Sequence, residues 1–329
     1  MGKITAIFII FFLIFTCLFS TTQSKVALDT NNSNEPEVVK NQLLIESAKI
    51  TDIGMQAAKE MLIEAFTENI TEADVARAAE QAMIDHGSSE YLEAFGVMVA
   101  SGEQSALPHG DASDDEINQI LPDEVVVVDL GARYRGYCTD LTRTFFMGVP
   151  TEEMVQVYEI VMEAQDAGIR AVRAGAIARE VDAAARDIIS GYGYGENFTH
   201  GLGHGIGLYI HMPPTLSPNS NEILFQSGDM AITIEPGIYL TGRWGIRIED
   251  DVLVKRTGYE VITNAPKGLS EAILYPLNPL NDTHNFDNEK SEENQNLNNI
   301  LLIGIIFIIG AIALGIIFYK KYKVSQTKR

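Results

Sequence analysis

Cysteine and basic side chains are scarce in this sequence, and each shortage excludes a class of protein. The 329 residues contain two cysteines, Cys17 and Cys138, and Cys17 lies within an apolar N-terminal run. A domain held together by internal disulfides is therefore excluded. Only 24 lysines and arginines stand against 45 aspartates and glutamates, a formal net charge of −21. Such a surface repels phosphate backbones, so we expect no nucleic acid among the partners.

Apolar sequence is plentiful, and it is concentrated partly at the N-terminal end. The chain is 46% hydrophobic and 21% charged, which is typical of a globular protein. Residues 4–19 are almost continuously apolar behind Lys3, and the small polar stretch Ser20-Thr21-Thr22 follows. This arrangement predicts a signal peptide, or an uncleaved signal anchor, over residues 1–22. A polar linker is expected over residues 23–40.

A second apolar run lies near the C-terminus. Residues 300–319 form an uncharged run, and this run is long enough to cross about 30 Å of hydrocarbon as a helix. A polar linker rich in Asn, Asp and Glu precedes it over residues 279–299, and a basic segment follows over residues 320–329. The length of the run predicts a single transmembrane helix in the lipid of the cell membrane. Its orientation follows from the basic flank, because basic flanks remain in the cytoplasm. The basic tail would be cytoplasmic and the preceding domain extracellular.

One domain remains over residues 41–278, and its periodicity mixes helices with strands. Thr71 is expected to cap a helix in which Asp74 completes the capping box. Apolar runs between turn residues predict strands over residues 125–128, 141–146, 230–234 and 244–248. The fold class is therefore α+β. Matching residues lie 106 positions apart, as Asp123 and Asp229 do, so we expect two related halves, each two helices followed by a hairpin.

The two expected hairpins bring four carboxylates to the centre of the domain. Asp129 follows four valines on a strand that should be buried, where a carboxylate costs several kcal/mol unless it is compensated. Folding the chain at residues 133–136 places Asp140 opposite Asp129. Folding it at residues 241–242 places Glu249 opposite Glu235. Because the repeat relates the two hairpins, all four acids converge, and two divalent cations would offset their repulsion.

Three of the six histidines lie in one glycine-rich segment, at His200, His204 and His211. The spacing of His200 and His204 resembles a helical zinc motif, but glycines at positions 201, 203, 205 and 207 disfavour a helix. We therefore expect a strand or loop with a histidine as the fifth candidate ligand. His109 stands alone on an expected loop, where a simple surface role is the competing interpretation.

Five motifs in this order resemble the pita-bread metallopeptidases, a family that includes methionyl aminopeptidase, aminopeptidase P and prolidase. The resemblance covers roughly residues 43–275 and implies the pita-bread fold of two pseudo-symmetric halves. The motifs are Val128-Asp129-Leu130-Gly131, Thr139-Asp140-Leu141-Thr142-Arg143-Thr144, Gly203-His204-Gly205-Ile206-Gly207, Ile234-Glu235-Pro236-Gly237 and Arg247-Ile248-Glu249-Asp250.

The resemblance also implies roles for individual residues. His109 and His211 look like the histidines that contact substrate, while His200 and Arg247 are similar to residues carried by the proline-specific members. Mn²⁺, Co²⁺ or Fe²⁺ suit such an oxygen-rich site, and Zn²⁺ also fits it. Two of these divalent ions would be held by Asp129, Asp140, His204, Glu235 and Glu249.

The function expected from this resemblance is a membrane-anchored exopeptidase that hydrolyses N-terminal Xaa-Pro bonds in peptides, acting as an aminopeptidase or a dipeptidase. Two metal ions would activate a water molecule, Glu235 would accept its proton, and His109 or His211 would stabilise the oxyanion. Met212 stands where the family usually has glutamate, which leaves the substrate preference open. The alternatives are a non-catalytic peptide-binding ectodomain and an aminopeptidase of the methionyl type, and assembly as a homodimer is left open.

Overall fold

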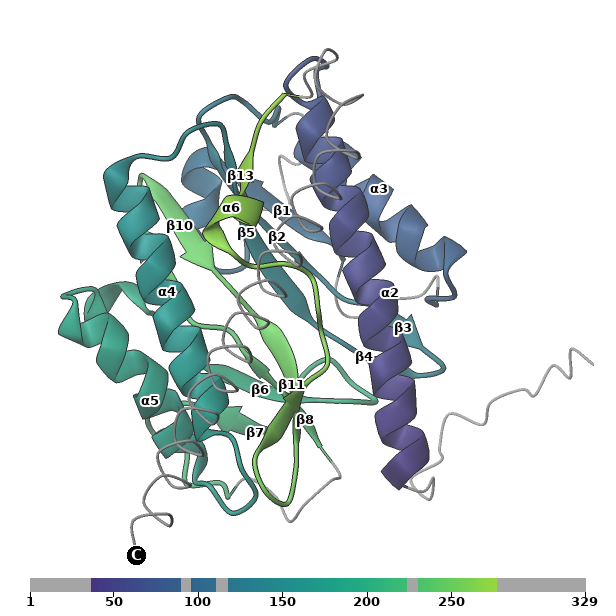
Figure 1. The fold of residues 1–329 in the computed structure, drawn as a ribbon, viewed down its shortest axis with the longest axis vertical. Coiled ribbons are helices and arrows are strands. Elements are labelled where there is room, and N and C mark those ends of the chain that lie inside the picture. Colours follow the sequence, from purple (N-terminus) through teal and green to yellow (C-terminus); the bar gives the residue numbers. More distant parts are fainter. Residues whose placement is uncertain (1–36, 90–95, 111–117, 224–229, 277–329) are drawn as a thin grey trace, which may run out of the picture. The chain divides into compact units, whose positions relative to one another are not determined.

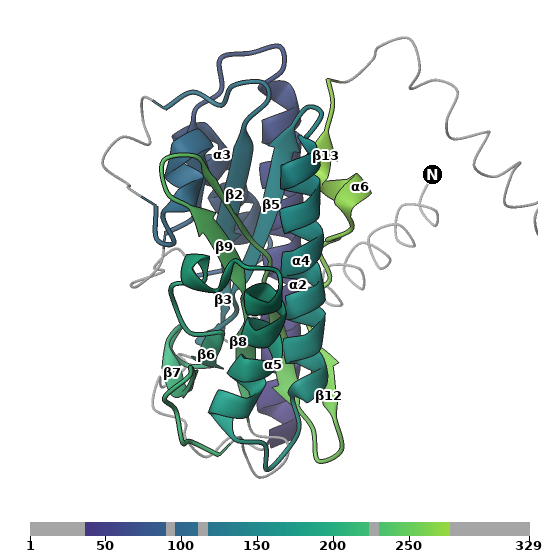
Figure 2. The same cartoon turned by 90° about the vertical axis from the view of Figure 1, so that its left-hand side faces the viewer.

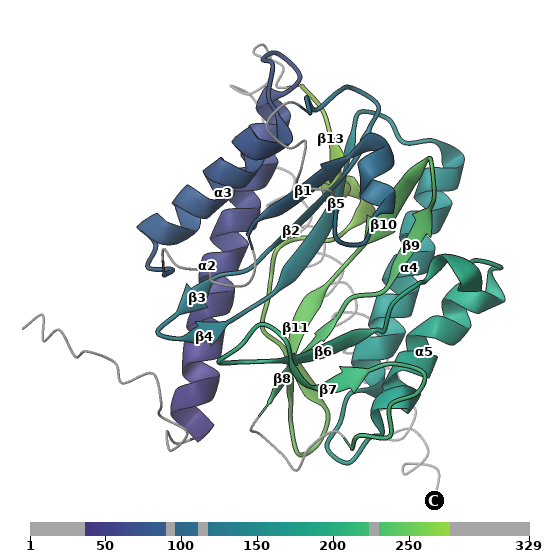
Figure 3. The same ribbon diagram turned by 180° about the vertical axis from the view of Figure 1, so that it is seen from behind.

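The computed structural model describes residues 37–89, 96–110, 118–223 and 230–276. Within these ranges the four long helices form two packed pairs. Helix α2 (Glu37–Glu64) packs against α3 (Glu72–Asp85), and α4 (Glu152–Ala171) packs against α5 (Ala178–Gly191). Helices α2 and α4 lie on the same side of the strands, in front of them in Figure 1 and behind them in Figure 3. Figure 2 shows α5 lying beside α4.

The expected start of α3 is confirmed. The Thr71 side chain accepts a hydrogen bond from the backbone N–H of Asp74, and the Asp74 side chain accepts one from the backbone N–H of Thr71. This reciprocal pair satisfies two N–H groups that the first turn of a helix leaves without partners, and such a cap contributes about 1 kcal/mol. The helix therefore begins where its sequence signal stands. Helix α2 begins at Glu37, within the segment expected to be a linker.

The strands form two larger sheets and two small ribbons. The first sheet has the order β1 (Met98–Ser101), β2 (Val125–Leu130), β5 (Leu141–Met147) and β13 (Ile273–Leu274). The second has the order β12 (Tyr259–Val261), β11 (Asp250–Val254), β8 (Ala231–Ile234), β6 (Gly203–Ile206) and β7 (Met212–Leu216). Ribbons pair β3 (Arg133–Tyr134) with β4 (Tyr137–Cys138), and β9 (Gly237–Leu240) with β10 (Trp244–Arg247). The short helices are η1 (Gly102–Ala106), η2 (Gly195–Asn197) and α6 (Leu269–Ala272).

Each helix pair covers its own apolar core. Leu62 and Met83, from α2 and α3, belong to a cluster with Val126 and Val128 of β2. In the other half, helices α4 and α5 pack on β8, β10 and β11 through a cluster that includes Val161, Ile189, Ile232, Ile246 and Val252. Burying a side chain of this kind contributes about 1.5–3 kcal/mol. Each hairpin region is thus fixed to its own helix pair.

The expected internal repeat is confirmed in the positions of the elements. Helix α5 begins and ends 106 residues after α3, and β8 begins 106 residues after β2. The added strands also correspond, because β1 pairs antiparallel with β2 and β6 pairs antiparallel with β8. The chain therefore folds as two related halves, as its sequence pattern predicts.

The second hairpin differs from the expected one. We expected one hairpin built from the strands over residues 230–234 and 244–248 and folded at residues 241–242, but its ladder is divided: β8 pairs with β11, and β9 pairs with β10. The physical reason is Pro236, which follows Glu235 and has no N–H to donate to a ladder. The register nevertheless continues across the gap, since Gly237 pairs with Arg247 and Ile234 pairs with Asp250. Glu235 therefore still stands opposite Glu249.

Several expectations concern residues beyond the described part. The signal peptide or anchor over 1–22, the linker over 279–299, the transmembrane helix over 300–319 and the basic tail over 320–329 all lie outside the described residues. Within the described ranges, none of the helices combines the length and apolar character needed to cross a bilayer.

Candidate metal centre and active site

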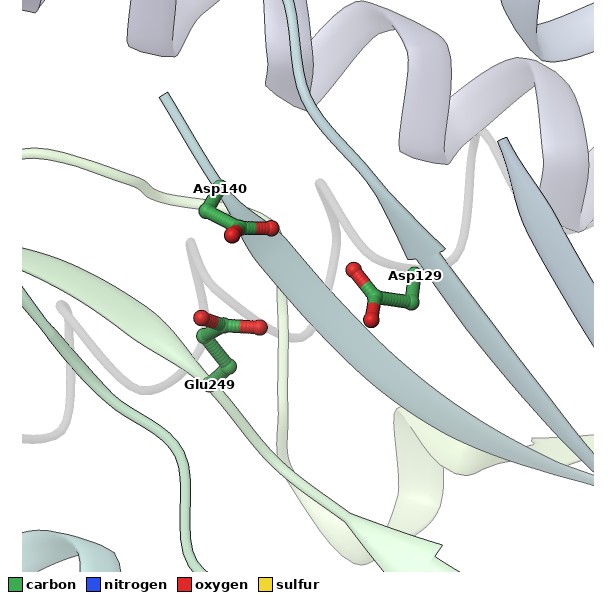
Figure 4. A group of neighbouring side chains, drawn as sticks. All are labelled: Asp129, Asp140 and Glu249. Carbon is green, nitrogen blue, oxygen red and sulfur yellow. The ribbon is translucent and has the colours of Figure 1, made fainter. Parts of the chain in front are cut away.

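Three carboxylates from both halves of the fold meet at the centre of the domain. Asp129 lies near the end of β2, Asp140 immediately precedes β5, and Glu249 immediately precedes β11. Each offers one oxygen that lies within 4.8 Å of those of the other two. Figure 4 shows the three side chains pointing toward one another. Three of the four carboxylates that we expected to converge therefore lie together in the folded chain.

The first hairpin places its acids two residues out of the expected register. Asp129 pairs with Thr142 across the β2–β5 ladder, so Asp140 is one diagonal step along the same face rather than directly opposite. Gly131 permits this approach, because a Cβ atom there would lie 1.9 Å from the carbonyl oxygen of Thr139. The carboxylates still meet, since diagonal neighbours on one face of a sheet remain within reach.

The unsatisfied oxygens of this cluster fit cations. Among the described residues, Asp129 Oδ1, Asp140 Oδ1 and Glu249 Oε1 are buried and accept no hydrogen bond. Burial, followed by the negative charges of neighbouring acids, raises the pKa of Asp140 and of Glu249 well above their usual values. Burial likewise raises the pKa of Glu235 to about 7. Buried carboxylates are stable when they are paired or coordinate metals, so this donor set fits the expected divalent ions.

His204 presents a ring nitrogen to the same cluster. Its Nε2 lies 3.4 Å from Glu235 Oε1 and 3.8 Å from Asp140 Oδ2. Its Nδ1 lies 3.0 Å from the carbonyl oxygen of Gly205, which can only accept, so Nδ1 carries the proton. Burial lowers the pKa of His204 to about 4. The imidazole is thus neutral with its Nε2 lone pair directed at the carboxylates, which is the form that binds metal.

Arg247 ties the cluster to its surroundings. Its guanidinium is buried and donates through Nη2 to Asp129 Oδ2 at 2.5 Å and through Nε to Thr142 Oγ1 at 3.0 Å. Thr142 in turn donates to Glu249 Oε2 at 2.6 Å. Arg247 Nη1 also donates to the carbonyl oxygen of Pro108, beside His109. One positive charge therefore offsets part of the repulsion and fixes the orientation of two carboxylates.

His200 is held by a hydrogen-bond chain that leads back to Arg247. The His200 Nδ1 donates to the carbonyl oxygen of Gly201 at 2.7 Å, which leaves Nε2 as an acceptor. The Tyr239 hydroxyl lies 2.9 Å from this Nε2 and donates to it, while Arg247 Nη1 donates to the same hydroxyl at 3.0 Å. Burial and then the charge of Arg247 lower the pKa of His200 to about 4, and burial raises that of Tyr239 to about 12. Both groups are neutral near pH 7.

A cavity of about 820 Å³ opens over this cluster. The His211 ring lies edge-on to that of His204, with 4.5 Å between centroids, and both His211 and His109 are exposed on the cavity wall. Met212 lines the same wall. All nine site residues named from the sequence border this one cavity: His109, Asp129, Asp140, His200, His204, His211, Glu235, Arg247 and Glu249.

Two residues that the sequence did not single out also take part in the site. Thr142 connects Arg247 to Glu249, and Tyr239 connects Arg247 to His200. Residues two apart on a strand share a face, and Tyr239 follows Glu235 by four. Because Glu235 and Pro236 lie between β8 and β9, this spacing does not identify Tyr239 from the sequence.

Comparisons with known proteins agree on the catalytic domain. A profile of metallopeptidase family M24 matches residues 42–256. The Xaa-Pro dipeptidase of Pyrococcus furiosus is 42% identical over 228 residues, which cover 69% of this chain and 62% of that protein. This chain therefore matches less than two thirds of that relative's length.

Solved structures give the same picture. The prolidase from Pyrococcus furiosus is similar with a TM-score of 0.63, at 42% identity over 69% of this chain and 64% of that one. The Xaa-Pro dipeptidase from Bacillus anthracis has a TM-score of 0.65, at 43% identity over 72% and 63%. The X-Pro aminopeptidase from Thermotoga maritima has a TM-score of 0.63, at 37% identity over 72% and 63%. The α+β fold is thus that of these proteins.

Proposed function

Because the chain belongs to metallopeptidase family M24, we propose that it is a metal-dependent exopeptidase that hydrolyses N-terminal Xaa-Pro bonds. The observation that carries the metal requirement is the set of three buried oxygens, on Asp129, Asp140 and Glu249, that accept no hydrogen bond. The relatives named as Xaa-Pro dipeptidases and X-Pro aminopeptidase support the bond specificity. His200 and Arg247, which border the cavity, agree with it.

The residues of the site divide the work of hydrolysis among them. Two divalent cations held by Asp129, Asp140, His204, Glu235 and Glu249 would supply Lewis acidity and lower the pKa of a water molecule. Glu235 is placed to accept the proton of that water, because its carboxyl borders the cavity and lies 3.4 Å from His204 Nε2. His109 and His211, on the cavity wall, bind the substrate and donate to the developing oxyanion.

Matched peptides test the specificity. The protein loaded with Mn²⁺ or Co²⁺ is assayed on an Xaa-Pro peptide, the same peptide with alanine in place of proline, and a Met-Ala peptide. We expect the highest kcat/KM for the Xaa-Pro bond. The variant His204→Ala is the control for contaminating peptidases, because it removes the imidazole that faces Asp140 and Glu235. Preference for Met-Ala would favour the methionyl type, and no cleavage of any peptide would favour a binding module.

The substitution at Met212 gives a second test. Met212 borders the cavity next to His211, where the family usually has glutamate. We expect Met212→Glu to raise kcat/KM on the Xaa-Pro peptide, because a carboxylate on the cavity wall can accept a hydrogen bond from a substrate or from a neighbouring side chain, which a methionine cannot do. Met212→Leu is the matched control, since it changes the shape of the wall without adding charge.

We also propose that the domain is anchored in the cell membrane and faces outward. The support is the uncharged run over residues 300–319 and the basic residues that follow it. A protease added to intact cells should cut the linker over residues 279–299 and release the domain. If the linker is cut only after lysis, the outward orientation is wrong.

A further inference from the structure

Helix α5 carries a bidentate ion pair that faces the histidine segment. Arg186 Nε lies 2.8 Å from Asp182 Oδ2, and Arg186 Nη2 lies 2.9 Å from Asp182 Oδ1. The Asp182 side chain is 1% exposed and that of Arg186 is 20% exposed. Bidentate pairs of this kind fix the orientation of both side chains as well as their distance. The pair is therefore a rigid group near the active site, although neither residue borders the cavity.

This pair holds three alternate residues of the segment that precedes His204. Arg186 Nη1 donates to the carbonyl oxygen of Phe198 at 2.9 Å, and Arg186 Nη2 donates to that of His200 at 2.6 Å. Asp182 Oδ1 accepts from the backbone N–H of Leu202 at 3.0 Å. The ion pair thus fastens the backbone on both sides of His200.

Ring contacts extend the same arrangement to the His200 side chain. The Arg186 guanidinium lies 4.0 Å from the centre of the Phe198 ring, and Phe198 meets the His200 ring edge-on at 5.1 Å. The His200 ring also lies near that of Tyr239, with 5.5 Å between the ring centres. His200 therefore contacts both a ring fixed by Arg186 and the tyrosine that donates to its Nε2.

The local sequence explains why such support matters. Residues 198–202 lie between η2 and β6, outside any helix or strand. Gly201 allows close packing, because a Cβ atom there would lie 2.5 Å from the carbonyl oxygen of Leu216, but glycine also gives the chain its largest freedom in the absence of restraints. Besides the hydrogen bond from His200 Nδ1 to the Gly201 carbonyl oxygen, the restraints on His200 come from outside the segment.

We infer that the Asp182–Arg186 pair is a positioning device for His200, setting its ring so that Nε2 accepts the Tyr239 hydroxyl. Its effect on turnover rests on the proposed function, while its effect on the ring does not. The competing interpretation is a general brace that only stabilises α5. The two differ in whether the pair acts through His200.

Two conservative variants test the inference. Arg186→Lys keeps the positive charge but loses the planar fork that reaches Asp182 and two carbonyls together. Asp182→Asn keeps the shape of the side chain but removes its charge. Arg170→Lys is the matched control, because Arg170 is also paired with an aspartate four residues away, Asp166, on an exposed part of α4. Metal content and thermal unfolding are measured for each variant.

The first readout does not depend on activity. The ¹⁵N NMR signals of the His200 ring report which nitrogen carries the proton and whether the other accepts a hydrogen bond. We expect the Nδ1–H form to be lost or mixed in Arg186→Lys and in Asp182→Asn, and to be unchanged in Arg170→Lys. Unchanged His200 signals in both variants at Asp182 and Arg186 overturn the inference.

The second readout is a double-mutant cycle on kcat/KM. Displacement of a positioned group by about 1 Å costs about 100-fold, so we expect Arg186→Lys to lower kcat/KM by about 10- to 100-fold at unchanged metal content. In the background of His200→Ala the same change should cost less than about twofold. Equal losses in both backgrounds show a general brace and overturn the inference. If the unaltered protein cleaves no peptide, the proposed function fails, and the NMR signals still decide the role of the pair.

Discussion

Removal of the metal ions should make the stability of this protein fall as the pH rises. Asp140, Glu235 and Glu249 have raised pKa values in the folded, metal-free chain, so between about pH 4.5 and pH 7 the folded state binds more protons than the unfolded state. Unfolding then releases protons. The stability that these groups contribute is fully present below about pH 4, and it is lost as the pH rises through their folded pKa values.

The magnitude follows from Glu235 alone. Its pKa rises from 4.5 to about 7, which corresponds to about 3 kcal/mol. In a domain of this size 1 kcal/mol shifts the melting temperature by about 2–4 °C, so Tm should fall by about 10 °C from pH 5 to pH 8. Cation binding raises the free energy of unfolding, by about 2.7 kcal/mol for each ion at a concentration 100 times its dissociation constant. The gain should be largest at pH 8, where protons no longer compete for the ligands.

Calorimetric melts of the metal-free and Mn²⁺-loaded protein at pH 5, 6, 7 and 8 test this reasoning. Because the net charge of −21 also destabilises the chain as the pH rises, the comparison uses Glu235→Gln and the control Glu159→Gln, which removes an exposed carboxyl on α4. The first should flatten the pH dependence and the second should not. A metal-free Tm that rises from pH 5 to pH 8, or an equal gain from Mn²⁺ at both, would refute the assignment.

Three further changes have distinct expected outcomes. His204→Ala should lower the metal content measured by plasma mass spectrometry, because a neutral imidazole aimed at the carboxylates is lost; full occupancy would contradict its place in the ligand set. Tyr239→Phe removes one hydroxyl, so kcat/KM should fall by about tenfold at unchanged metal content, and equal rates would show that its hydrogen bonds do not affect turnover. Gly131→Ala should lower the unfolding free energy in urea by roughly 1–3 kcal/mol, because its Cβ would meet the Thr139 carbonyl at 1.9 Å. Gly191→Ala, at a position with no neighbouring atom within 4 Å, is its control, and equal effects would contradict the steric reason.

The parts of the fold that were predictable rest on short-range chemistry. The cap at Thr71 and Asp74 depends on residues three apart, and the repeat depends on a fixed offset, so both can be read along the chain. The interruption of the second hairpin at Glu235 was not predicted, although Pro236 marks the point where a ladder cannot continue. A run of apolar residues on both arms of a hairpin does not reveal that its ladder is divided between two sheets.

The site divides in a similar way. Its carboxylates are conspicuous because acids at the ends of apolar strands need compensation. Tyr239 passes unnoticed because a tyrosine on a strand is an ordinary core residue, and only the folded structure brings its hydroxyl to His200 and Arg247. The Arg186–Asp182 pair has the spacing of a common surface pair on a helix. Its contacts with the histidine segment arise from packing that the sequence does not display.

The two halves of the fold are alike in backbone but unequal in the ligands they supply. Val126 of β2 pairs with Ser101, and Ile232, which lies 106 residues later on β8, pairs with Gly205. The residue that precedes Ser101, Ala100, is therefore the counterpart of His204, and it has no donor atom to offer. Among the residues assigned as metal ligands, the nitrogen donor therefore comes from one half of the fold only. Two ions bound there would have different donor sets and therefore different affinities, so a calorimetric titration of the metal-free protein should resolve two binding steps.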